Sequence, residues 1–85
     1  MSLKILYFAW LRERIGRAEE EIDLPASVTT AAELIEFLRG KGEEYAIAFA
    51  NPKIVRVALD KTHVQPDARI GGAREIAFFP PMTGG

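Results

Sequence analysis

The sequence contains no cysteine and a single histidine, His63. The absence of cysteine excludes disulfide bonds, zinc sites with thiolate ligands and a cysteine nucleophile in this chain. His63 has no clustered carboxylates in the sequence around it, so we interpret it as a surface residue on a strand and expect no metal site. Small secreted domains usually need disulfides, so the composition favours a cytoplasmic protein.

Long apolar runs and an excess of charge of one sign are also missing. No window approaches the roughly 20 apolar residues that span a bilayer, and the N-terminal residues lack the pattern of a signal peptide. The 11 basic and 12 acidic side chains nearly cancel, so there is no positive field for nucleic acid and no polybasic segment for a membrane surface. We therefore expect neither nucleic acid nor a membrane among the partners.

The 85 residues match a single domain, and a chain this short buries only about 60% of the surface that its unfolded form exposes. Short apolar or alternating segments, bounded by proline, glycine or turn residues, predict strands. These segments are residues 3–9, 20–24, 54–59, 63–65 and 75–79. Asp60 and Lys61 predict the turn between the third and fourth of them.

A helix over residues 31–39 has the clearest local signals. Thr30 lies three residues before Glu33, which is the spacing of a capping box. Leu34, Ile35 and Leu38 recur at helical spacing, and we assign them to the core. Residues 10–16 predict a connecting turn of helix, while residues 43–50 fit either a short second helix or an extended segment, of which we favour the helix.

The order of two strands, a helix and two or three further strands predicts an α+β fold. If the first strand lies beside the last, the connection through the helix makes that pair parallel. The prediction is a β-grasp (ubiquitin-like) fold, in which a mixed sheet of four to five strands wraps on one main helix. Residues 1–79 would form this domain, and residues 80–85 would form an extended C-terminal tail.

The tail consists of Pro80, Pro81, Met82, Thr83, Gly84 and Gly85. Neither proline can extend a sheet, because proline has no backbone N–H and a fixed backbone angle. The two glycines have no side chains, so the end of the chain is thin. These features predict insertion into a narrow channel of another protein, where the terminal carboxylate of Gly85 reaches a buried site.

The last predicted strand also presents an aromatic side chain beside the tail. If Ile76 and Phe78 fill the core, strand alternation makes Phe79 project outward. By the same alternation Phe8 shares the outer face with Lys4, and it lies near Phe79 if the first and last strands pair. Clustered exposed aromatics usually mark an interface, so we predict that Phe8 and Phe79 contact a partner.

Two segments carry a family resemblance. The ending AFFPPMTGG at residues 77–85, together with KILYFAWLRERIG at residues 4–16, resembles the small subunit of molybdopterin synthase, a ubiquitin-like sulfur carrier. The resemblance covers the whole chain in length and element order. Members of that family often have an acidic Asp-Gly-Asp-Glu turn before the last strand, whereas this chain has Gly71-Gly72-Ala73-Arg74-Glu75.

The resemblance implies a mechanism that starts at Gly85. A ubiquitin-activating-like adenylyltransferase would adenylate its carboxylate with ATP, and a sulfur donor protein would convert the adenylate to a thiocarboxylate. The tail would deliver the sulfur to cyclic pyranopterin monophosphate in the large subunit of a heterotetramer. The resemblance also implies that this chain binds no cofactor and has no catalytic site of its own, and it places His63 with Phe8 and Phe79 on the docking face.

Three alternatives remain open from the sequence. The related sulfur carrier for thiamine thiazole synthesis also ends in Gly-Gly, but it usually lacks the Phe-Phe-Pro-Pro approach seen here. A ubiquitin-like protein modifier would attach to lysines through Gly85. A β-grasp binding module with an inert tail would use neither reaction.

Overall fold

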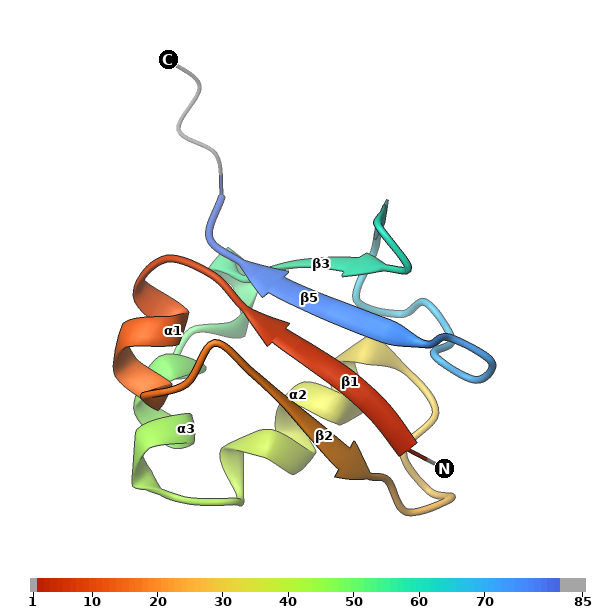
Figure 1. Ribbon diagram of the computed structural model, residues 1–85, viewed down its shortest axis with the longest axis horizontal. Helices are drawn as coiled ribbons and strands as arrows, with labels where there is room; N and C mark the ends of the chain where they lie inside the picture. Colours follow the sequence, from red (N-terminus) through yellow and green to blue (C-terminus); the bar gives the residue numbers. More distant parts are fainter. Residues whose placement is uncertain (1, 82–85) are drawn as a thin grey trace.

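The computed structural model describes residues 2–81 of the chain. Its elements in chain order are β1 (Ser2–Tyr7), α1 (Trp10–Ile15), β2 (Glu19–Asp23), α2 (Ala31–Arg39), α3 (Glu43–Ala48), the 3-10 helix η1 (Pro52–Ile54), β3 (Arg56–Leu59), β4 (Thr62–Val64) and β5 (Glu75–Phe79). The strands form one sheet, α2 crosses one of its faces, and α1 and α3 lie together at one end (Figure 1). Within residues 2–81, no helix has the length and apolar character needed to cross a membrane.

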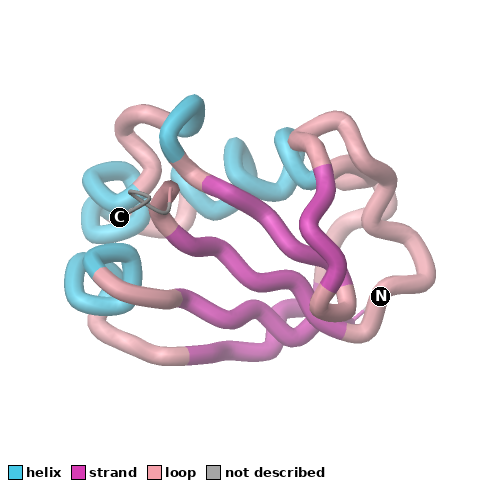
Figure 2. The backbone as a smooth tube through the Cα atoms, turned by 90° about the horizontal axis from the view of Figure 1, so that it is seen from above, coloured by secondary structure: helices cyan, strands magenta, loops and turns pink. Residues whose placement is uncertain are grey.

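The five-stranded sheet has the order β2-β1-β5-β3-β4. β1 and β5 are neighbours and run parallel, with Tyr7 opposite Phe78, while β2 pairs antiparallel with β1 and β3 pairs antiparallel with β5. The helices lie along one side of the strands and at one end of them (Figure 2). This arrangement confirms the predicted mixed sheet wrapped on one main helix.

Helix α2 has the predicted bounds because its signals are local. The Glu33 amide donates to Thr30 Oγ1 at 3.2 Å, and the Thr30 amide donates to Glu33 Oε1 at 3.1 Å, which completes the capping box. Leu34, Ile35 and Leu38 are buried against the sheet as predicted. Burial of each such side chain stabilises the fold by about 1.5–3 kcal/mol relative to exposure.

An aromatic cluster packs the tail-proximal end of the sheet against the helical side of the fold. The rings of Phe49 and Phe78 meet edge to face with centroids 5.3 Å apart, and the Tyr7 ring lies 6.4 Å from that of Phe78. All three side chains are almost wholly buried. The inner face of β5 is therefore fixed by core packing as far as Phe78.

Several predicted boundaries were wrong by a few residues. The first strand ends at Tyr7 and not at residue 9, because Ala9 turns the chain with φ 55° and ψ −133°. The third strand begins at Arg56 and not at residue 54, because Pro52 starts the 3-10 helix η1. The second and fourth strands lie one residue earlier than predicted, and α3 ends at Ala48 and not at residue 50.

Candidate functional site

The root of the tail is held at the centre of the sheet. β5 is hydrogen-bonded to β1 on one side and to β3 on the other, and Phe79 is its last residue. Pro80 and Pro81 follow and cannot donate to either neighbour. The predicted insertion residues Met82, Thr83, Gly84 and Gly85 lie outside the described residues, so their role and the division of the chain at residue 79 stay predictions.

A shallow apolar groove of about 590 Å³ adjoins this root. It is lined by Phe8, Ala9, Ala58, Ala77, Phe79, Pro80 and Pro81. The lining comes from the end of β1, from β3 and from β5, so the sheet itself sets its shape. We call this surface the docking groove.

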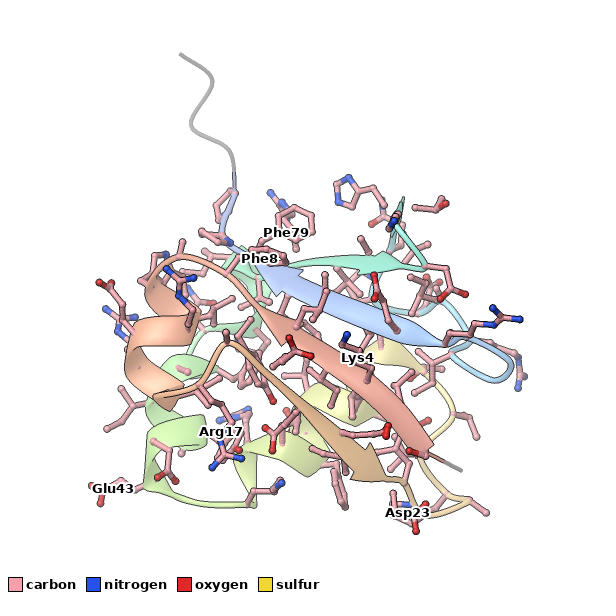
Figure 3. All side chains as sticks on the ribbon, in the orientation of Figure 1. Lys4, Phe8, Arg17, Asp23, Glu43 and Phe79 are labelled. Atoms are coloured by element: carbon pink, nitrogen blue, oxygen red, sulfur yellow. The ribbon has the colours of Figure 1, made fainter. Side chains whose placement is uncertain are left out.

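Phe8 and Phe79 meet in the docking groove, as strand alternation predicts. The Phe8 amide donates to the Phe78 carbonyl at 3.1 Å, which continues the β1–β5 register by one residue. The Phe8 side chain is 46% exposed, whereas Phe78 is fully buried. Figure 3 shows Phe8 and Phe79 together on the side of the sheet away from α2, next to the start of the tail.

His63 also lies on this face. It pairs with Ala58 across the β3–β4 hairpin, and its ring centroid lies 5.7 Å from that of Phe79. Within residues 2–81, no group of three or more histidine and carboxylate side chains could hold a metal ion. The structure thus brings the three predicted interface residues together, and their contact with a partner stays a prediction.

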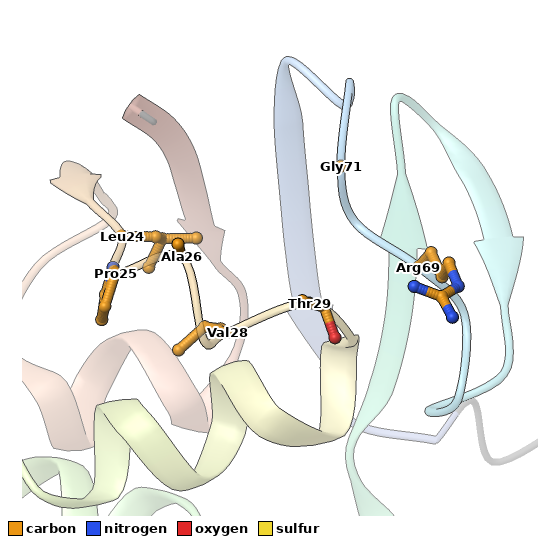
Figure 4. Close-up of a pocket in the computed structure, with 7 residues that line it drawn as sticks. All are labelled: Leu24, Pro25, Ala26, Val28, Thr29, Arg69 and Gly71. Atoms are coloured by element: carbon orange, nitrogen blue, oxygen red, sulfur yellow. The ribbon is translucent and has the colours of Figure 1, made fainter.

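A second pocket, of about 430 Å³, lies between the segment after β2 and the loop before β5 (Figure 4). Its lining is Leu24, Pro25, Ala26, Val28, Thr29, Arg69 and Gly71. Among these described residues Arg69 alone is ionisable, and the pocket is at the end of the sheet opposite the tail root. We therefore assign the candidate site to the docking groove.

Comparison with known proteins identifies the family. The model of the ThiS family matches residues 5–85. The chain belongs to the ThiS family. Curated relatives include the molybdopterin synthase sulfur carrier subunits of Haemophilus influenzae, 39% identical over 98% of this chain and 99% of that protein, and of Escherichia coli, 32% identical over 98% and 99%.

Solved structures support the same fold. The putative molybdopterin converting factor subunit 1 from Pyrococcus furiosus aligns with a TM-score of 0.76 and 26% identity, covering 96% of this chain and 99% of that one. SAMP1 from Haloferax volcanii aligns with a TM-score of 0.73 over 100% of both chains, but at 20% identity it shows the fold alone. The ThiS family membership and these alignments confirm the resemblance drawn from the two sequence segments.

An acidic residue of the β3–β4 turn contacts the backbone at the start of β5. The Asp60 carboxylate, in the β3–β4 turn, accepts from the amides of Arg74 at 2.9 Å and Glu75 at 3.0 Å. Asp60 and Lys61 both have positive φ, as a two-residue hairpin turn of type I′ requires. The acidic group that supports the start of β5 is therefore supplied from a neighbouring turn.

Sequence reasoning missed a partly buried carboxylate on the inner side of β2. Glu20 has an 8% exposed side chain, and its Oε2 accepts from the hydroxyls of Tyr7 at 2.7 Å and Tyr45 at 2.6 Å. Its Oε1 pairs with Arg17 at 3.1 Å and with Lys41 at 3.4 Å. Burial alone would raise the pKa of Glu20, but the two hydroxyl donors and the two cations outweigh it and lower that pKa.

The Glu20 cluster ties the docking end of the sheet to the helices. Tyr7 is the last residue of β1, directly before Phe8, and Tyr45 belongs to α3. Burial, followed by the hydrogen bond to Glu20, raises the pKa of both tyrosines, that of Tyr45 to about 12. Both hydroxyls therefore stay protonated as donors near neutral pH, and they fix the end of β1 directly before Phe8.

Ala9 is the other feature that sequence reasoning missed. Its φ of 55° with ψ of −133° is a conformation that a non-glycine residue rarely adopts. Such a residue costs about 1–3 kcal/mol and persists where the surroundings fix it, often beside functional surfaces. Ala9 and the preceding Phe8 both line the docking groove, so this turn lies at its edge.

Proposed function

We propose that this ThiS family protein is the sulfur carrier subunit of a molybdopterin synthase. The full-length similarity to proteins of that name carries the proposal. The docking groove supports it, because an apolar surface beside a stiff diproline suits a chain that docks while its end enters a partner. The tail would bring no side-chain catalyst, so the chemistry belongs to the terminal carboxylate.

Activation of Gly85 is the first proposed step. A carboxylate is a poor electrophile, so a ubiquitin-activating-like adenylyltransferase joins a Gly85 carboxylate oxygen to the α-phosphate of ATP and releases pyrophosphate. Hydrosulfide from a sulfur donor protein then attacks the carbonyl carbon and displaces AMP. The product is a thiocarboxylate, in which one oxygen of the terminus has been replaced by sulfur. ATP is bound by the activating enzyme, and this chain binds no cofactor.

Sulfur delivery is the second proposed step. The large subunit of a heterotetrameric synthase docks on the groove and receives the tail in its active site. The thiocarboxylate sulfur, a strong nucleophile, forms a C–S bond with cyclic pyranopterin monophosphate on the way to molybdopterin. Water then cleaves the bond between the sulfur and the Gly85 carbonyl carbon, which leaves the sulfur on the pterin and restores the Gly85 carboxylate. This chain is then half of a sulfurtransferase, and because the activation consumes ATP we place it in the cytoplasm.

Intact-mass measurement tests the proposal. The wild-type chain, incubated with the adenylating enzyme, ATP and a sulfide source, should gain the mass difference between sulfur and oxygen, and fragmentation should place it on Gly85. Deleting Gly85 should abolish the gain with the melting temperature nearly unchanged, because the residue lies beyond the core strand.

The same substitution at two glycines, one in the tail and one in the loop before β5, supplies the matched control. Gly84→Val should block activation, since a branched side chain widens and stiffens the tail. Gly71→Val should not, because a Cβ added at Gly71 meets no atom within 4 Å and Gly71 is not among the glycines of positive φ. Sulfur uptake by the chain without Gly85 would refute the tail mechanism. Isopeptide adducts in cell extract would identify a protein modifier, and transfer to a thiazole precursor would identify the thiamine pathway.

A further inference from the structure

The outer face of the sheet is divided by charge on either side of the docking groove. On the β2 side, Lys4 forms a salt bridge with Glu19 at 3.1 Å. The hydrogen bond and the charge of Glu19 raise the pKa of Lys4, with smaller contributions from Glu75 and Glu21. This side therefore holds an excess of acidic groups, and its lysine is already paired.

The β3–β4 side of the groove holds the opposite charge. Arg56 lies directly opposite Phe79 in the β3–β5 ladder, and residues paired in this way project from the same face of a sheet. His63 of β4 projects from the same face, opposite Ala58 of β3, and its ring contacts that of Phe79. Lys53 lines a neighbouring hollow of about 540 Å³ together with Arg56 and His63.

Arg56 and Lys53 are in no salt bridge within the part of the chain that the structure describes. The salt bridges there involve Lys4, Arg17, Arg39 and Lys41. Arg56 is exposed on an otherwise well-paired sheet. An arginine held on a strand beside an apolar contact is suited to bidentate recognition of a carboxylate.

We propose that Arg56, assisted by His63, binds a carboxylate of the large subunit beside the Phe79 contact and so fixes the orientation of docking. The inference rests on the proposed function, which supplies the partner. Apolar contact is non-directional and allows the groove to be covered in several orientations. An acidic group that meets Arg56, and avoids the acidic β2 side, selects one of them. That orientation aims the tail into the channel.

Binding kinetics with the purified large subunit test this assignment. Arg56→Gln should lower the association rate constant roughly 3- to 10-fold at low salt and flatten its dependence on ionic strength, because charges at an interface rim act chiefly on association. Arg56→Glu should lower it further, and Arg56→Lys should restore most of the rate. The matched control is Arg74→Gln, which removes an exposed, unpaired charge at the opposite end of β5.

The outcomes separate this inference from the proposed function. If Arg56→Glu binds at the wild-type rate while the wild type binds and transfers sulfur, the carboxylate contact is wrong and the function stands. If Arg74→Gln slows association as much as Arg56→Gln does, the effect is one of net charge and the local contact is also wrong. If the wild type itself neither binds the large subunit nor transfers sulfur, the proposed function fails first. Equal melting temperatures for the variants confirm that folding is unchanged.

Discussion

Replacing Glu20 by alanine should destabilise the fold, because its carboxylate is the acceptor for two tyrosine hydroxyls on the inner side of the sheet. The Glu20 side chain is 8% exposed, so in the alanine variant water can replace little of the lost hydrogen bonding to the two tyrosine hydroxyls. A hydrogen bond to a charged group contributes about 1.5–3 kcal/mol, and a buried donor left without its acceptor costs about 1–3 kcal/mol. We expect a loss of about 3 kcal/mol, which corresponds to a fall in melting temperature of roughly 12–24 °C for a domain of this size.

The effect should depend on pH with a defined sign. The pKa of Glu20 is lower in the folded chain than its ordinary value of 4.5. The ionised carboxylate therefore contributes stability above that value, and the contribution is lost as the pH falls through the lower, folded pKa. At the alkaline end the pKa of Tyr45 is raised from 10.0 to about 12. Stability should fall as the pH rises through this interval, because the unfolded chain releases the tyrosine proton first.

Urea denaturation followed by the fluorescence of Trp10, the single tryptophan, measures these differences. Glu36→Gln is the matched control, since Glu36 pairs with Arg39 at 2.8 Å but is 67% exposed. An exposed pair of this kind contributes little, and we expect a change below about 0.5 kcal/mol. A Glu20→Ala variant as stable as wild type at pH 7, or a difference that persists undiminished at pH 3, would refute the reasoning.

Two further predictions concern the docking groove and the core. Phe79→Ala should weaken binding of the large subunit by about 2 kcal/mol or more, as for a central aromatic anchor; titration calorimetry with unchanged affinity would remove Phe79 from the interface. Leu38→Ala should cost about 2–5 kcal/mol of stability, because Leu38 is fully buried on α2; chemical denaturation that shows almost no loss would contradict this packing.

The elements that could be predicted from the sequence are those whose limits are set locally. Helix α2 has both its capping box and its apolar repeat within ten residues, and β5 is stopped by Pro80. The end of β1 could not be predicted in the same way. Ala9 carries no glycine-like signal for positive φ, and it directly precedes α1, whose Leu11 and Ile15 side chains are buried in the core.

The candidate site shows the same limit. Phe8 and Phe79 follow from strand alternation, which each strand contains by itself. Glu20 looked like an ordinary polar position, since Tyr45, its partner, is 25 residues away in the chain. Arg56 becomes relevant only when the β3–β5 register places it opposite Phe79. The alternating pattern of each strand does not predict which residues of distant segments will be in contact.

The central position of β5 separates folding from sulfur delivery. Phe78 is part of the core, Phe79 is part of the docking groove, and the tail begins at the next residue. Changes after Phe79 therefore leave the core packing intact, while the two flanking strands hold the tail root rigid. The six residues 80–85 span at most about 22 Å when fully extended. In the proposed complex, the reaction centre of the large subunit must lie within that distance of the surface that covers Phe8 and Phe79.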